Sequence, residues 1–246
     1  MAFFDFEKYT PHSGWHESVE DDLKAVGALI GFDIERLYFT GFWSQGDGAC
    51  FEGSLGYAKG ASAAIREYAP HDTVLHDIAD RWTALQKRNF YAITGQVRQR
   101  GRYHHSGCTS FDFEDSRHGY GWTSAAFDED EAVRIVRDLM DWAYNQLKNE
   151  YEYQQAYSLA DAHLDLTREL AGNRAETLAL VRAIKAERKQ GRSAAVVICA
   201  ALMGRIRQLL ASRETMRAER AAIADNFRYW LDGQPVSLSE FKATYF

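Results

Sequence analysis

Apolar residues recur with helical spacing near the start of the chain. Successive members of one set are separated by four, four, three and four positions and therefore share one helical face: Trp15, Val19, Leu23, Val26 and Ile30. Gly31 follows at once, and glycine is the usual residue just after a helix end. This spacing predicts an amphipathic helix over residues 15–30.

Two later segments alternate between apolar and polar residues, as strands with one buried face do. Residues 34–57 hold two aromatic-rich runs around a polar, glycine-containing turn at residues 44–48. Residues 90–99 and 109–114 alternate on either side of a second turn. The sequence therefore predicts two β-hairpins with about four strands. Between the hairpins, Pro70 ends one expected short helix, and Asp72 is a good N-cap for another that ends near residue 89.

The C-terminal part shows helical spacing and no convincing strand. Asp128 opens a helix that is expected to run to Gly172, and Asn173 begins the next one in this prediction. A third helix is expected over residues 193–224, and Ser237 caps a short terminal one. The predicted class is α+β: a small antiparallel sheet with helices, followed by an all-helical part. The expected domains are 1–126, a connecting helix over 127–172, and a basic helical module over 173–246.

Composition narrows the cellular setting. The cysteines, Cys50, Cys108 and Cys199, are odd in number and widely spaced, which favours a reducing compartment over a disulfide framework. The N-terminus lacks the basic and apolar regions of a signal peptide, and the most apolar window, residues 194–203, is too short to span a bilayer. We therefore expect a cytoplasmic protein without a membrane segment.

The net charge of −6 is unevenly distributed. Residues 1–165 carry 27 acidic and 15 basic side chains, whereas residues 166–246 carry 8 acidic and 14 basic ones. Opposite potentials on two parts of a chain can steer different partners, although two solvated helical surfaces of different composition would give the same counts. The acidic first part opposes a broad nucleic-acid footprint, so direct nucleic-acid binding is not expected.

The turn at residues 44–48 is the first place where chemistry could reside. Its glycines could let backbone amides approach an anion while Asp47 takes a metal or a proton, and Gln45 beside it could contact a partner. The turn lacks the lysine-containing ending of a phosphate-binding loop, so the alternative is that Asp47 satisfies the turn's own backbone.

A second cluster, His104, His105 and Cys108, places two imidazoles and a thiol close together. These are zinc ligand types, and a thiol beside a histidine can also act as a nucleophile. Neither the paired cysteines of a structural zinc site nor a distinguishing spacing is present, so no metal or other cofactor is predicted. The nearby Asp112 and Glu114 could serve metal-dependent hydrolysis, but their spacing is also that of a wet sheet face.

Aromatic and arginine side chains in the helical part are candidates for a protein interface, because Trp, Tyr and Arg anchor such interfaces. Core packing with arginine stems over apolar surface is the alternative. Together with the first hairpin, the interaction candidates are Trp43, Gln45, Asp47, Trp142, Tyr151, Tyr153, Arg205, Arg207, Arg213 and Arg217.

The segment SQGDGACFEG within residues 38–53 resembles a group of phage and prophage proteins that carry a SQGDGACF-type signature and are often labelled antitoxins. Further similar pieces lie at residues 58–60, 65–70, 86–91 and 101–108, so the resemblance covers about residues 15–115. It implies a phage or mobile-element accessory protein and carries over no catalytic residue. Residues from about 166 onward do not resemble the group.

These observations lead to a functional expectation: a non-enzymatic anti-defence inhibitor, of the anti-CRISPR or anti-restriction type, that binds a host defence complex such as a CRISPR effector subunit. Three alternatives remain open at this point. They are an acidic DNA mimic, an antitoxin of a toxin–antitoxin pair, and a small metal- or thiol-dependent enzyme that uses Asp47, His104 and Cys108.

Overall fold

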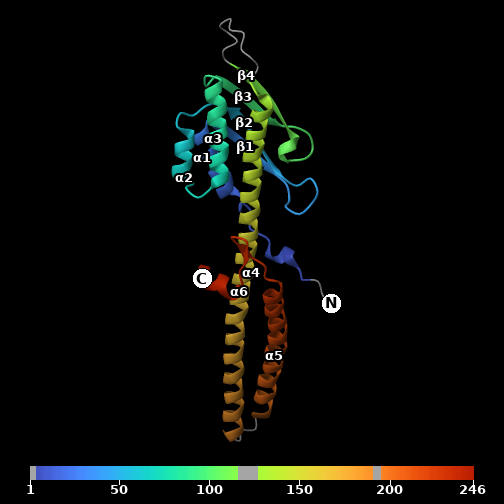
Figure 1. Cartoon of the computed structure of the whole chain (residues 1–246). Coiled ribbons are helices and arrows are strands. Elements are labelled where there is room, and N and C mark those ends of the chain that lie inside the picture. Colours follow the sequence, from blue (N-terminus) through green and yellow to red (C-terminus); the bar gives the residue numbers. More distant parts are fainter. Residues whose placement is uncertain (1–3, 116–126, 191–194) are drawn as a thin grey trace. The chain divides into compact units, whose positions relative to one another are not determined.

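The structure is a computed structural model that describes residues 4–115, 127–190 and 195–246. The chain divides into two compact units. We call Ser13–Tyr151 the sheet unit, and Met1–His12 together with Glu152–Phe246 the helical unit. One long helix, α4 (Glu129–Gln190), contributes residues to both (Figure 1).

The sheet unit contains a four-stranded antiparallel sheet in the order β1-β2-β3-β4 (Figure 1). The strands are β1 (Phe32–Phe39), β2 (Ala49–Leu55), β3 (Ile93–Gln99) and β4 (Thr109–Asp115). The helices are α1 (Glu17–Ile30), α2 (Ala61–Tyr68) and α3 (Thr73–Arg88), with a short 3-10 helix η2 (Ser106–Cys108) before β4. The predicted α+β class with two hairpins is confirmed.

One face of this sheet is buried under helices and the other is wet. Ile93 and Val97 on β3 share a core with residues of α1, α2, α3 and the first part of α4. Thr94, Gln96 and Asp112 point the other way and are exposed. The alternation in the sequence therefore predicted correctly that one sheet face is buried and the other is exposed, and the exposure of Asp112 fits the interpretation of a wet sheet face.

The strand predicted from residue 90 begins later than expected. Phe90 and Tyr91 have φ angles of 56° and 61°, which are left-handed conformations outside the strand region. They form the exit of α3, where the Tyr91 amide donates to the Gln86 carbonyl (2.7 Å). The buried Gln86 side chain then bonds both backbone groups of Ile93 and so aligns the start of β3 with the end of α3.

The predicted helix break at Gly172 and Asn173 is wrong. α4 is one helix of 62 residues through both positions. Asn173 is buried, its amide nitrogen donates to the Leu209 carbonyl (2.9 Å), and its oxygen accepts from Arg213. Its polar atoms are thus satisfied by α5 (Ala195–Asn226), so no local cap forms there.

The helical unit consists of the rest of α4, α5 lying antiparallel to it, and a small C-terminal cap. The cap holds α6 (Leu238–Tyr245), which begins with the capping box that Ser237 predicted. It also holds a ribbon of β5 (Trp230–Leu231) and β6 (Gln234–Pro235), which the sequence did not predict. Asp232 and Gly233 turn this ribbon with φ angles of 51° and 75°. A 3-10 helix, η1 (Phe6–Tyr9), belongs to the same unit.

The two compact units divide the chain after His12 and after Tyr151, whereas the expected domains end at residues 126 and 172. The first part of α4 lies in the core of the sheet unit, where Ile135, Leu139 and Leu147 are buried with the sheet. The sheet unit therefore ends at Tyr151 and includes the first half of the expected connecting helix over residues 127–172. Within the described ranges, no helix has both the length and the apolar character needed to cross a bilayer.

Candidate interaction surface at the first hairpin loop

The loop that joins β1 to β2 is held by its own aspartate. One carboxylate oxygen of Asp47 accepts hydrogen bonds from the backbone amides of Trp43 (3.0 Å) and Ser44 (2.6 Å). The Thr40 amide donates to the Gly48 carbonyl (3.0 Å) and closes the base of the loop. These amides lie four and three residues before Asp47, so its carboxylate organises the backbone of its own loop.

The organised loop presents one large aromatic side chain to solvent. Trp43 is 66% exposed, although its ring lies edge-on to Phe42 and Tyr151 at centroid distances of 5.7 and 5.4 Å. Phe42 in turn packs on Trp15 and Tyr144. Two interaction candidates, Trp43 and Tyr151, are therefore neighbours.

The Tyr144 hydroxyl donates to the Gly41 carbonyl (3.3 Å) and ties α4 to the loop. Burial, with a smaller effect of the Asp47 carboxylate, raises the pKa of Tyr144. The phenol therefore stays protonated and keeps its donor at neutral pH. Gln45, at the tip of the loop, is exposed. The surface formed by Trp43, Gln45 and Tyr151 is called the Trp43 surface below.

The loop before η2 packs directly on the first hairpin. A Cβ atom at Gly48 would lie 2.4 Å from the Cβ and 2.8 Å from the Cα of His105, so the close approach requires glycine. The ring of His104 packs on Tyr38 at 5.4 Å, and its Nδ1 lies 3.4 Å from the Phe39 carbonyl oxygen. The two sequence clusters that stood apart thus form one structural block.

Glu52 on β2 joins this block from the other side. Its carboxylate accepts from the Tyr38 hydroxyl (2.7 Å) and from the Gln99 amide (3.0 Å), which links β1 to the end of β3. The hydrogen bond to Glu52 is the main cause that raises the pKa of Tyr38. Sequence reasoning did not single out Glu52, and its polar side chain inside an apolar strand was the available signal.

His105 and Cys108 form a pair of their own. The Sγ of Cys108 lies 3.3 Å from His105 Nε2, and the Gly107 amide donates to His105 Nδ1 (3.1 Å). Cys50 lies fully buried on β2, where burial raises the pKa of its thiol to about 12, with smaller contributions from Cys108 and Glu52. Cys50 is therefore a protonated core residue.

The three residues of the enzyme alternative have separate partners. Asp47 accepts from amides of its own loop, His104 lies against Tyr38 and the Phe39 carbonyl, and Cys108 pairs with His105. Among the residues that the structure describes, no group of three or more His, Cys, Asp or Glu side chains is placed to hold a metal ion. Among the hydrogen bonds of the described residues in this block, one joins a nucleophile to an imidazole, namely Cys108 with His105.

The aromatic candidates on α4 lie in different surroundings. Trp142 is buried, and its indole nitrogen donates to Asp72 (2.8 Å), so it is a core residue that fixes the start of α3. Tyr153 belongs to the helical unit, where its ring packs against Tyr229, Phe241 and Tyr245. Neither ring is as exposed as that of Trp43.

The arginine candidates divide in the same way. Arg205 pairs with Glu176 (2.9 Å), and Arg213 donates to Asn173 and Thr177 (2.9 and 3.0 Å), so both join α5 to α4. Arg207 and Arg217 are exposed. Half of the predicted basic set therefore serves the contact between the two helices.

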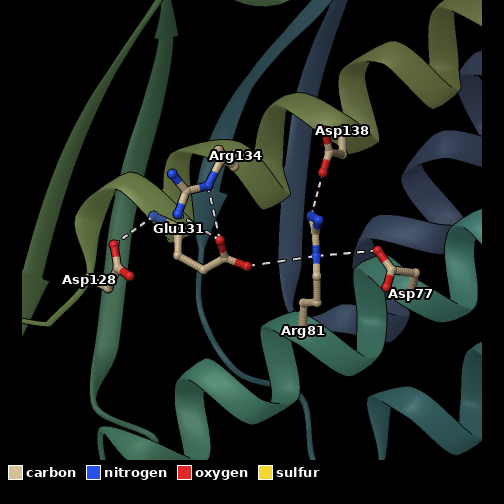
Figure 2. A network of polar contacts seen from close by, with 6 residues as sticks. All are labelled: Asp77, Arg81, Asp128, Glu131, Arg134 and Asp138. Carbon is tan, nitrogen blue, oxygen red and sulfur yellow. Dashed lines mark hydrogen bonds and ion pairs between the residues drawn. The ribbon is translucent and has the colours of Figure 1, made fainter.

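An acidic region lies where α3 meets the first part of α4 (Figure 2). Arg81 approaches Asp77 (3.3 Å) and Glu131 (3.8 Å) and bonds Asp138, while Arg134 pairs with Glu131 (2.9 Å). Burial is the largest cause that raises the pKa of Asp138, and Arg81 opposes it. Beside this network is a pocket of about 330 Å³ whose acidic lining is Asp72, Asp77, Asp138 and Asp141. Two arginines thus offset part of the negative charge that the composition predicts for a DNA mimic.

Comparison with known proteins adds a family but no activity. The family model described as a domain of unknown function, DUF8835, matches residues 15–156. No curated protein and no solved structure matches the chain. The matched segment holds the sheet, α1 to α3 and the first part of α4, and thus the whole Trp43 surface.

Proposed function

The chain belongs to the DUF8835 family, and we propose that it is a non-enzymatic inhibitor from a phage or other mobile element that blocks host defence by binding a protein complex. The observation that carries the proposal is the Trp43 surface. Trp43 is 66% exposed on a loop whose backbone is held by Asp47 and by the Thr40–Gly48 bond. A large aromatic on a rigid support is the usual anchor of a protein interface, since little entropy is lost when it is buried.

The resemblance of this same loop to phage and prophage proteins supports a host partner. Defence complexes, such as a CRISPR effector or a restriction enzyme, are the host assemblies that a phage gains most by blocking, and the proposed place of action is the host cytoplasm. Arg207 and Arg217 on α5 are exposed and supply a second, basic contact in this proposal. In this proposal the sheet unit provides the anchor.

A matched pair of tryptophans tests the proposal. Trp43 and Trp230 are 66% and 59% exposed and belong to different units, so Trp43→Ala and Trp230→Ala remove the same side chain at similar exposure. The chain is expressed in bacteria with an active CRISPR or restriction system, and plaque formation by a targeted phage is counted. We expect the wild type and Trp230→Ala to restore plaques and Trp43→Ala to fail.

Affinity capture with mass spectrometry from the same cells identifies the partner. Wild type and Trp230→Ala should recover a defence subunit that Trp43→Ala does not, and circular dichroism should show equal folding of all three. Capture of no defence component by the wild type would refute the proposal. Equal loss of binding in both variants would refute the assignment to the Trp43 surface.

A further inference from the structure

Two stripes of side chains run along the hairpin that α4 and α5 form in the helical unit (Figure 1). Positions that follow one another at steps of three and four residues share one side of a helix. Two sets have this spacing: Arg174, Leu178, Val181 and Lys185 on α4, and Met203, Arg207, Leu210, Glu214 and Arg217 on α5. All of these side chains except the half-buried Val181 are exposed. Each helix therefore has an uncovered side that mixes apolar and charged residues.

The ion pair between the helices shows that the two stripes lie on the same side of the hairpin. Glu176 on α4 pairs with Arg205 on α5 (2.9 Å). Residues two positions apart on a helix are turned by about 200° from one another and so point in nearly opposite directions. The stripe residues two positions from this pair therefore lie on the side of the hairpin opposite to it: Arg174 and Leu178 on α4, and Met203 and Arg207 on α5. Because the helices are antiparallel, Leu178 lies level with Met203, and one turn away Arg174 lies level with Arg207.

Arg174 and Arg207 thus place two cations side by side. Among the residues that the structure describes, neither guanidinium has an ion pair with a carboxylate. The acidic side chains of this part of α4 gather on the other side of the hairpin: Asp165, Glu169 and Glu176. Like charges held together repel, and carboxylates from a partner would remove that repulsion. The charge of this side therefore favours an acidic partner.

Apolar side chains lie on both sides of this arginine pair. Leu178, Met203 and Leu210 are 49%, 40% and 44% exposed. Met203 and Leu210 are seven residues apart, about 10 Å along the helix axis, and Arg207 lies between them. A single exposed apolar residue is ordinary on a protein surface, but three grouped around one arginine pair form a patch that a partner can cover.

We propose that this side of the hairpin, the Arg174–Arg207 face, binds an acidic amphipathic helix of a partner protein. A third helix laid along the hairpin would bury the three apolar side chains and set carboxylates against the two arginines. Nucleic acid would use the arginines and leave the apolar side chains without contacts. A second copy of the same face would bring like charges together.

The Arg174–Arg207 face specifies the second, basic contact of the proposed inhibitor and in that role rests on the proposed function. Its own evidence lies in the helical unit and is separate from the Trp43 surface. An experiment on the face alone can therefore fail or succeed independently of the plaque assay with Trp43→Ala.

Two synthetic helical peptides test the chemistry of the face with the full chain. One carries Leu at every seventh position, Glu midway between the leucines, and Ala and Gln elsewhere; the other has Lys in place of Glu. Fluorescence anisotropy should show that the Glu peptide binds at least about tenfold more tightly than the Lys peptide, and that added salt weakens its binding. Hydrogen exchange should show that the Glu peptide protects residues 170–185 and 199–217.

Matched variants locate the binding within the helical unit. Arg174→Glu combined with Arg207→Glu, and separately Leu210→Gln, should each weaken binding of the Glu peptide at least about fivefold. Arg168→Glu and Leu231→Gln change exposed residues of the same unit outside the two stripes and should leave the affinity unchanged. Circular dichroism should show equal helix content in all of these variants.

The wild type alone can already overturn the assignment, because the two peptides differ only in the sign of their charge. Equal affinity for both peptides, or protection outside residues 170–185 and 199–217, would refute it. Undiminished binding by Arg174→Glu with Arg207→Glu would do the same. Tighter binding of a DNA duplex than of the Glu peptide at the same salt concentration would assign the face to nucleic acid instead.

Discussion

Gly172 offers a direct test of the continuous helix α4. It lies inside α4, and a Cβ atom built there meets no atom within 4 Å. An alanine would therefore fit without strain and would gain the difference in helix propensity between alanine and glycine. That difference is about 0.5–1 kcal/mol in a helix interior. Gly172→Ala should raise the free energy of unfolding of the helical unit by this amount.

Gly31 supplies the opposite case in the same chain, because it is a glycine at a true helix end. It follows α1 with a φ of 98°, and a Cβ atom there would lie 2.6 Å from the Ala58 nitrogen. The left-handed conformation costs about 1–2 kcal/mol for an alanine, and the overlap with backbone adds about 1–3 kcal/mol. Gly31→Ala should therefore destabilise the sheet unit by roughly 2–5 kcal/mol.

Native-state hydrogen exchange measured by mass spectrometry is the suitable assay, since it reports each unit separately. Peptides around residue 172 should exchange more slowly in Gly172→Ala, and peptides of α1 and β1 should exchange faster in Gly31→Ala. Faster exchange around residue 172 in Gly172→Ala would refute the continuous helix. It would indicate that the glycine ends a helix there, as the local sequence pattern predicted.

The remaining predictions concern the packed hairpin block and a titrating histidine. Gly48→Ala should lower the free energy of unfolding of the sheet unit by about 1–3 kcal/mol in a urea titration, because its Cβ overlaps His105. Gly56→Ala, whose Cβ would lie 3.5 Å from its nearest neighbour, should be close to neutral in the same titration. Burial, Lys242 and Arg220 lower the pKa of His163, so the unfolded chain binds a proton more readily and stability of the helical unit falls as pH drops below 6.5. His163→Gln should flatten that pH dependence in denaturation curves measured between neutral and mildly acidic pH, and an unchanged slope would show that other groups cause it.

Local patterns predicted the elements of the sheet unit because the same residues decide local and tertiary structure there. Buried Ile93, Gly95 and Val97 alternate with exposed residues along β3. This alternation is typical of a strand and also follows from a sheet with one buried face. The Asp72 cap is similar, since its carboxylate accepts from the amides of Val74 and Leu75 within its own turn.

The helix break at Asn173 was predicted wrongly because asparagine can either cap a helix or form a tertiary hydrogen bond from within one. Asn173 with a glutamate three positions later matches a capping box, yet the tertiary contact with Leu209 and Arg213 satisfies its amide in mid-helix. The contact of Gly48 with His105 is likewise absent from any local pattern, because the two residues are brought together only when β2 and the loop before η2 pack. Gly48 beside a strand indicates a close approach of two chain segments, but the sequence does not show that the other segment is the one with His105.

The signature segment separates into residues that build the loop and residues that the loop displays. The carboxylates of Asp47 and Glu52 accept hydrogen bonds from backbone amides, and Glu52 also accepts from the Tyr38 hydroxyl. His105 occupies the space that a side chain at Gly48 would need. Trp43 and Gln45 have their side chains directed to solvent. A sequence signature made mainly of loop-building residues identifies a scaffold, and the two displayed positions are where a partner would be distinguished. In the proposed function, the resemblance to phage proteins would therefore concern chiefly the support of the Trp43 surface, and Trp43 and Gln45 would be the positions that distinguish one partner from another.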